Sequence, residues 1–204
     1  MALIEIRTLS SNTQLGLWHI TETVEELYFQ YPYLSVYREY IDCKFHSDSR
    51  KKEFLTIRVL LAVMTGDHSL RIYHHANGRP LLSNGKNISI SHTRGYATLI
   101  ISDIINTAID IEYRSDRVSK IAHKFIRDDE TAQDAISQLI HWSAKETTYK
   151  YFSSYDLQYF DMKLQKLGLS EKGLVIVENL RCKSFITVAY EVTDDYVMTY
   201  VCEE

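Results

Sequence analysis

Two stretches of the chain carry side chains that could do chemistry together. Asp110 and Glu112 alternate with isoleucines, so in a strand both carboxylates project from the same face. Further along, Trp142, Glu146 and Lys150 recur every four residues, which places them on one stripe of a helix. Carboxylates from a strand and a helix suit a hard cation such as Mg²⁺, which completes its shell with water and substrate phosphates. The spacing therefore predicts a metal site beside an ammonium group.

A strand and a helix must position these groups. Alternating residues predict the strand at 108–112, and a helical pattern runs from Ser115 to about Lys150, with a break and a new N-cap near Asp128 and Asp129. A basic stripe on the first part of this helix suits steering of an acidic protein partner, and a solvated face is the alternative. The stripe consists of Arg117, Lys120, Lys124 and Arg127.

Caps, turns and alternation predict the other elements. Thr23 and Glu26 have capping-box spacing for a short helix. A stronger helix begins at Ser47 and ends at Gly66. Asn77-Gly78-Arg79-Pro80 is typical of a turn. Strands are predicted at 2–8, 13–20, 87–92, 96–101, 173–178, 184–191 and 196–202.

An internal similarity bears on domain organisation. Thr93-Arg94-Gly95-Tyr96 and Thr193-Asp194-Asp195-Tyr196 stand one hundred positions apart, and each leads into an apolar strand. A chance match is the alternative to a duplication. A duplication predicts an α+β chain of two similar, closely packed lobes, 1–103 and 104–204, each a small, mainly antiparallel sheet packed with helices.

Composition bounds the class of protein. The chain has 204 residues, 45% of them apolar, and a net charge of −4, which argues against nucleic acid as the main partner. No apolar run reaches the roughly eighteen residues of a membrane span, and no secretory signal is present, so we expect a cytoplasmic protein with no membrane contact. Cys43, Cys182 and Cys202 are predicted to be free thiols packed in the interior, without a disulfide or a zinc site.

Four short motifs, taken in order, point to a known enzyme family. They are Asn77-Gly78-Arg79-Pro80, Ile88-Ser89-Ile90-Ser91-His92-Thr93, Ile109-Asp110-Ile111-Glu112, and Trp142-Ser143-Ala144-Lys145-Glu146 with Lys150. In order and spacing they resemble the motifs of the 4′-phosphopantetheinyl transferases, in particular the surfactin-type, pseudo-dimeric branch. Each motif alone is weak, and the set is specific because four stand in register over most of the chain.

The resemblance implies an activity and its partners. Similar proteins transfer 4′-phosphopantetheine from coenzyme A to a serine of an apo acyl or peptidyl carrier protein, with Mg²⁺ as cofactor, and release adenosine 3′,5′-bisphosphate. We therefore expect coenzyme A and a carrier protein as partners, with the basic stripe contacting the carrier. A monomer is also implied, since one chain would supply both lobes of the site.

The resemblance also implies roles for individual residues. Asp110, Glu112 and Glu146 would hold the metal, and Trp142 would pack against the helix. Within a catalytic set of Asp110, Glu146 and Lys150, the glutamate would accept the serine proton and the lysine would reach the phosphates or protonate the leaving oxygen. The coenzyme A phosphates would be contacted by Lys150, Arg79, Ser91, His92, Arg50 and Arg58.

Some positions depart from the family pattern. Ala108 stands where the family usually has Gly, Arg79 where Lys is common, and Thr147 where a small residue is usual. Arg in place of Lys keeps a phosphate-binding charge. The departures leave open a second hypothesis, a non-catalytic relative that binds coenzyme A or a carrier protein as a scaffold or regulator. A small nucleotide hydrolase is a third, but no Gly-rich phosphate loop accompanies the acids.

Overall fold

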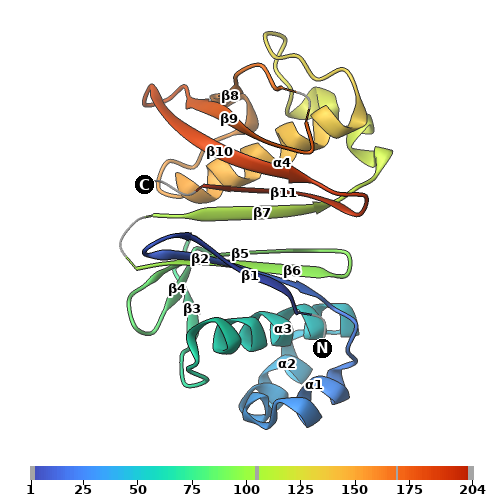
Figure 1. The fold of residues 1–204 in the computed structure, drawn as a ribbon, viewed down its shortest axis with the longest axis vertical. Helices are drawn as coiled ribbons and strands as arrows, with labels where there is room; N and C mark the ends of the chain where they lie inside the picture. Colours follow the sequence, from blue (N-terminus) through green and yellow to red (C-terminus); the bar gives the residue numbers. More distant parts are fainter. Residues whose placement is uncertain (1–2, 104–105, 169, 202–204) are drawn as a thin grey trace.

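Two antiparallel sheets and two long helices form the framework of the computed structural model (Figure 1), which describes residues 3–103, 106–168 and 170–201. The first sheet has the strand order β1-β2-β6-β5, with β1 (Leu3–Ser10), β2 (Thr13–His19), β5 (Asn87–Thr93) and β6 (Tyr96–Ser102). The second has the order β7-β11-β10-β9-β8, with β7 (Ala108–Tyr113), β8 (Met162–Leu164), β9 (Lys172–Asn179), β10 (Ser184–Val192) and β11 (Tyr196–Val201). A separate ribbon pairs β3 (Ile72–His74) with β4 (Pro80–Leu82).

Helices pack on one side of each sheet, so the predicted mixture of helices and antiparallel sheets is confirmed (Figure 1). The first sheet contacts α3 and the second contacts α4. The helices are α1 (Val24–Gln30), η1 (Pro32–Tyr37), α2 (Arg38–Lys44), α3 (Asp48–Thr65), η2 (Asp116–Lys120), η3 (Ala122–Lys124), α4 (Ala135–Tyr151) and η4 (Tyr159–Asp161), where η marks a 3-10 helix.

The helix ends in the N-terminal half follow the predicted signals. The Thr23 hydroxyl accepts a hydrogen bond from Glu26 N, and the Glu26 carboxylate accepts one from Thr23 N, which is the predicted capping box. The Ser47 hydroxyl accepts a hydrogen bond from Arg50 N at the start of α3. Gly66 ends α3 in a left-handed conformation, with φ 69°.

The predicted helix from Ser115 to Lys150 is wrong over its first half. The 3-10 helices η2 and η3 occupy that part, and α4 begins only after Asp134, whose carboxylate caps the first turn by accepting two backbone N–H hydrogen bonds. The predicted N-cap near Asp128 and Asp129 is not used. The Asp129 carboxylate instead forms ion pairs with Arg127 and Lys163.

Three apolar clusters hold these elements together. The first lies between the first sheet and its helices, around Trp18 and Leu60. The second lies between α4 and the second sheet, around Ile140 and Val188. The third joins the two sheets and contains Leu15, Leu17, Ile100, Ile109, Ile111 and Met198. Because β7 buries Ile109 and Ile111 against the first sheet, its acidic residues face the other way, toward α4, as the alternation predicts.

The two sheets share a pattern of connections. In the first, β2 precedes α3 and pairs with β6, the second strand of the β5–β6 hairpin. In the second, β7 precedes α4 and pairs with β11, the second strand of the β10–β11 hairpin. The two hairpins meet at their turns, where the rings of Tyr96 and Tyr196 lie 4.9 Å apart between centroids.

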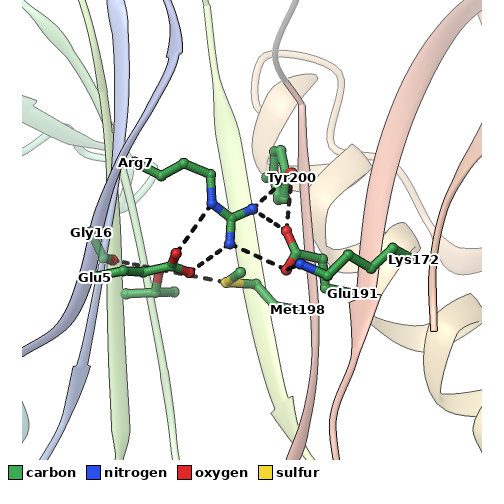
Figure 2. A network of polar contacts seen from close by, with 8 residues as sticks. Glu5, Arg7, Gly16, Lys172, Glu191, Met198 and Tyr200 are labelled. Atoms are coloured by element: carbon green, nitrogen blue, oxygen red, sulfur yellow. Dashed lines mark hydrogen bonds and ion pairs between the residues drawn. The ribbon is translucent and has the colours of Figure 1, made fainter.

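A network of charged side chains joins the sheets on the outside (Figure 2). Arg7 on β1 donates hydrogen bonds to Glu5 and, across the junction, to Glu191 on β10. Lys172 lies 2.9 Å from Glu191, and the Tyr200 hydroxyl donates to the same carboxylate at 3.2 Å. Burial acts to raise the pKa of Glu191, but the hydrogen bonds from Arg7 and Lys172 outweigh it, so the pKa lies below its ordinary value.

The cysteines correct one prediction. Cys43 and Cys182 are free thiols, as predicted, but both are exposed, so their predicted burial is wrong. Cys43 lies on the solvent side of α2, and Cys182 lies in the turn between β9 and β10. Cys202 lies outside the described residues. Within the described ranges, no helix combines the length and apolar character needed to cross a bilayer.

Candidate active site

Asp110 lies where β5, β7 and α4 meet. Its buried carboxylate accepts three side-chain hydrogen bonds: Oδ1 from Ser91 Oγ at 2.9 Å and from Lys150 Nζ at 2.8 Å, and Oδ2 from Ser143 Oγ at 2.9 Å. Ser91 comes from β5, whereas Ser143 and Lys150 come from α4. One carboxylate therefore ties the edge strands of both sheets to the helix.

β5 presents every second side chain to β7. Ser89 Oγ accepts a hydrogen bond from Ile109 N at 3.1 Å, and Thr93 Oγ1 accepts one from Tyr113 N at 2.8 Å. Ser91 lies between them, because residues two apart share one face of a strand. These hydroxyls take the place of backbone pairing, since β5 and β7 belong to different sheets. The strand predicted at 87–92 is thus one wall of the site.

Glu112 and Glu146 each have one oxygen held by an aromatic side chain. Trp142 Nε1 donates to Glu112 Oε1 at 2.8 Å, and the Tyr159 hydroxyl donates to Glu146 Oε1 at 2.7 Å. Burial raises the pKa of Glu112 to about 7, and repulsion from Asp110 adds to the shift. Burial also raises the pKa of Glu146, although the hydrogen bond from Tyr159 opposes it. The site therefore holds three carboxylates that repel one another.

Lys150 connects the carboxylates to a cavity. Its ammonium donates to Asp110 Oδ1 and to the carbonyl oxygen of Ile109 at 2.9 Å. An ammonium has three donors, so one N–H remains for a ligand within the described surroundings. The side chain is 26% exposed and lines the cavity, so this donor is accessible.

The cavity has a volume of about 420 Å³, which suits a small-molecule site. Arg79, Ser91 and His92 line it together with Lys150, as the predicted phosphate contacts require. Arg79 Nη2 donates to the neutral side chains of Asn106 at 2.6 Å and Asn87 at 3.3 Å. Among the residues that the structure describes, Arg79 forms no ion pair with a carboxylate. Its charge is therefore available to an anionic ligand.

A comparison with protein families assigns the part of the chain that carries the acids. Residues 107–201 match the family model of the 4′-phosphopantetheinyl transferase superfamily. None of the curated proteins matches the chain. The superfamily segment, residues 107–201, contains β7 and α4 and hence Asp110, Glu112, Glu146 and Lys150, whereas the Arg79 to His92 wall precedes it.

The acids of the superfamily segment fit a divalent cation in ligand type and charge. Glu112 and Glu146 each keep one oxygen that accepts no hydrogen bond within the described residues. Asp110 accepts three hydrogen bonds, and a carboxylate has about four acceptor sites, so about one remains. As placed, no three acidic, histidine or cysteine side chains of residues 3–103, 106–168 and 170–201 converge on a metal position. Binding of one cation by all three carboxylates would therefore need them to move toward one another.

A second cavity, of about 200 Å³, adjoins the first and shares His74, Ile90 and His92 with it. The predicted residues Arg50 and Arg58 line this second cavity and not the first. Burial holds the pKa of His92 below its ordinary value, although Glu53, 3.3 Å away, opposes the shift.

The two arginines of the second cavity differ in their partners. Arg50 Nη1 pairs with Glu53 at 3.1 Å and lies 3.2 Å from His92 Nε2. The guanidinium carbon of Arg58 lies 3.1 Å from the ring centroid of Phe54, and its buried Nε has no hydrogen-bond partner. Burial lowers the pKa of Arg58 to about 10. Arg58 therefore keeps a buried donor without a hydrogen-bond partner among the described residues.

The predicted basic stripe does not lie on one α-helix, because η2 and η3 replace the helix there. Arg117, Lys120 and Lys124 are exposed. Arg127 is occupied by Asp129 and by the carbonyl oxygen of Phe160. Contact of these residues with a carrier protein stays a prediction.

Sequence reasoning missed several residues that hold the site. Ser143 is one helical turn from Glu146, so helical spacing could have identified it. Ser89 and Thr93 share the face of Ser91 and follow from strand alternation. Tyr159 carries no such signal, since it follows α4 through an irregular segment.

Proposed function

We propose that this protein transfers the 4′-phosphopantetheine group from coenzyme A to a serine of an apo acyl or peptidyl carrier protein, in a Mg²⁺-dependent reaction that releases adenosine 3′,5′-bisphosphate. One observation carries the proposal. Ser91 and Lys150 line the 420 Å³ cavity and both bind Asp110 directly behind its wall. A cationic cavity of ligand size therefore lies directly beside Asp110, one of the acids of the superfamily segment.

The residues present can support each part of the reaction. The serine oxygen would form a bond to the phosphorus that carries pantetheine, and the bond from that phosphorus to the bridging oxygen would break. Glu146, whose pKa is raised by burial, would accept the serine proton. Lys150 would donate its free N–H to the departing bisphosphate, and Arg79 and His92 would bind the phosphates from the opposite wall.

The metal belongs to the same proposal. Asp110, Glu112 and Glu146 would hold Mg²⁺, which when bound would neutralise charge on the phosphate oxygens. Burial and mutual repulsion disfavour three ionised carboxylates in one place, and a cation would relieve that cost.

We further propose that residues 1–103 and 104–204 are related lobes and that the chain acts as a monomer in the cytoplasm. The shared strand order around α3 and α4 supports the duplication, as does the contact between Tyr96 and Tyr196 at equivalent hairpin turns. The surfactin-type branch of the superfamily agrees with two lobes in one chain.

The direct test is a carrier modification assay. The protein is incubated with coenzyme A, Mg²⁺ and an apo carrier from fatty-acid or peptide synthesis, and the carrier is weighed by mass spectrometry. The expected result is a mass gain of one phosphopantetheine on one carrier class. Glu146→Gln should lower turnover by about a hundredfold or more while leaving the circular dichroism spectrum unchanged, because it removes the proposed base. Failure to modify any carrier would overturn the proposal.

One observation favours a second candidate, a non-catalytic binder of coenzyme A or a carrier protein. Lys150, Ser91 and Ser143 already occupy about three of the four acceptor sites of the Asp110 carboxylate. Isothermal titration calorimetry discriminates the two. Binding of coenzyme A that is independent of Mg²⁺, with no product formed, supports the binder, whereas Mg²⁺-dependent binding with turnover supports the enzyme.

A further inference from the structure

Tyr159 lies outside every sequence motif of the site and still contacts it. Its ring packs on Trp142, with 5.0 Å between centroids and 34° between planes. Its hydroxyl donates to Glu146 Oε1 at 2.7 Å, as Trp142 Nε1 donates to Glu112. Two packed aromatic rings thus hold two glutamates by their polar ends. Each glutamate keeps its second oxygen for other partners.

The turn that carries Tyr159 is itself fixed to its surroundings. The carbonyl oxygen of Asp161 accepts a hydrogen bond from Leu180 N at 2.8 Å. Arg127 donates to the carbonyl oxygen of Phe160. The next residues form β8, which pairs with β9 at the edge of the second sheet. The phenol is therefore presented from a rigid support, and Arg127 has a role that its predicted contact with a carrier did not include.

Glu146 lines one of two cavities that share Tyr149. It lines a cavity of about 350 Å³ together with Tyr159 and Tyr149. Tyr149 also lines the 420 Å³ cavity that holds Lys150. A glutamate side chain that lacks a fixed partner samples several rotamers, so a carboxylate in this position needs a donor to select one. Within the described residues, the Tyr159 hydroxyl is the hydrogen-bond donor to Glu146.

We infer that Tyr159 is a positioning residue, whose hydroxyl fixes the Glu146 carboxylate in the cavity that both residues line, so that its second oxygen is available to the acceptor hydroxyl. The inference rests on the proposed function for the identity of that hydroxyl. It assigns a role to the segment between α4 and β8, which the sequence motifs leave without one.

The test compares Tyr159→Phe with a matched control in the full chain. Tyr159→Phe keeps the ring on Trp142 and removes only the hydroxyl. Tyr155→Phe removes an exposed phenol hydroxyl from the same loop and serves as the control. Both variants are also made in the Glu146→Gln background, and turnover is followed by single-turnover mass spectrometry of the carrier. Crystal structures of the wild type and Tyr159→Phe supply a readout that is independent of activity.

Tyr159→Phe should lower kcat about ten- to a hundredfold, as expected for loss of a hydrogen bond to a charged group, with KM for coenzyme A unchanged. In the Glu146→Gln background the same substitution should have no further effect on kcat, because Tyr159 acts through Glu146. The Glu146 side chain should leave its wild-type rotamer in the variant crystal structure. Tyr155→Phe should match the wild type in every measurement.

Two outcomes overturn the inference: an equal loss of kcat in both backgrounds, or a Glu146 rotamer that is unchanged in Tyr159→Phe. If the wild type modifies no carrier, the proposed function fails instead. The crystal structures then decide the positioning role alone.

Discussion

Two lysines on α4 form ion pairs of nearly the same length in different surroundings. Lys145 Nζ lies 2.7 Å from Glu130 Oε2, and both side chains are 0% exposed. Lys150 Nζ lies 2.8 Å from Asp110 Oδ1, and 26% of the lysine side chain is exposed. Solvent access therefore separates a pair that can only support the fold from one that can exchange a partner for a ligand.

Both members of the buried Lys145 pair have further hydrogen-bond partners besides each other. Lys145 also donates to the carbonyl oxygen of Phe125 at 2.6 Å. Glu130 accepts backbone N–H hydrogen bonds from Leu164 at 2.7 Å and from Arg127 at 2.8 Å. Burial lowers the pKa of Lys145, and the hydrogen bond to Glu130 opposes this effect. The pair fastens the irregular segment before α4, and the strand β8, onto the helix.

The position of each lysine on the helix explains the difference. Residues five apart on an α-helix point about 140° away from each other. Lys145 is therefore directed into the buried interior beside α4, whereas Lys150 is directed to β7 and the cavity. A charged residue within a functional motif can therefore be structural, and the burial of both partners of its ion pair identifies it.

Breaking the buried pair should have the largest effect on stability. Lys145→Met should lower the free energy of unfolding by about 3 to 5 kcal/mol, because it leaves Glu130 charged and buried without its cation. Equilibrium urea unfolding followed by circular dichroism measures this change. The double variant Lys145→Met, Glu130→Gln should recover part of the loss. A single variant as stable as the wild type would show that the pair does not hold the segment.

Breaking the cavity pair should instead remove activity and leave the fold. Lys150→Ala should lower kcat/KM for carrier modification by about a hundredfold, which corresponds to the loss of a preorganised donor to a charged group. Its free energy of unfolding should fall by about 1 kcal/mol only, because Ser91 and Ser143 still bind Asp110. The same urea titration and the carrier assay measure both quantities. Unfolding comparable to that of Lys145→Met would remove the distinction between the two lysines.

Local periodicity explains how much of the site could be predicted. Strand alternation places Asp110 and Glu112 on one face, and helical spacing places Glu146 and Lys150 near them; the structure brings all four together. The three hydrogen bonds to Asp110 could not be predicted as a set, because they depend on how β5, from a different sheet, packs beside β7.

The irregular segments could not be predicted because tertiary contacts determine them. Ser115 is an acceptable N-cap, and the residues after it have helical spacing, so local signals favour a helix. In the structure, Phe125 is buried against Trp142 and its carbonyl oxygen is bound by Lys145, which holds the chain in short 3-10 turns instead. The placement of Tyr159 depends on the same region through Arg127.

A further prediction concerns how the stability around the buried Lys145–Glu130 pair depends on pH, and its effect should be the smallest. His141 is 1% exposed, lies one helical turn before Lys145, and its Nδ1 donates to the carbonyl oxygen of Ser137 at 2.8 Å. Burial lowers the pKa of His141 below the ordinary 6.5, with Glu130 opposing the shift and Lys145 adding to it. In the folded chain His141 therefore resists a proton that it accepts in the unfolded chain. The contribution of His141 to the free energy of unfolding is present above about pH 6.5 and is lost as the pH falls below that value.

His141→Gln should flatten this acid side of the stability profile, because glutamine does not titrate. Urea midpoints measured from pH 7.5 down to pH 5.5 should fall less steeply in the variant than in the wild type. The exposed His123→Gln is the matched control and should keep the wild-type slope. Parallel profiles for His141→Gln and the wild type would mean that other groups govern the acid loss. A flattened profile would show that the surroundings of Lys145 exclude a further positive charge, as expected for a pair closed to solvent.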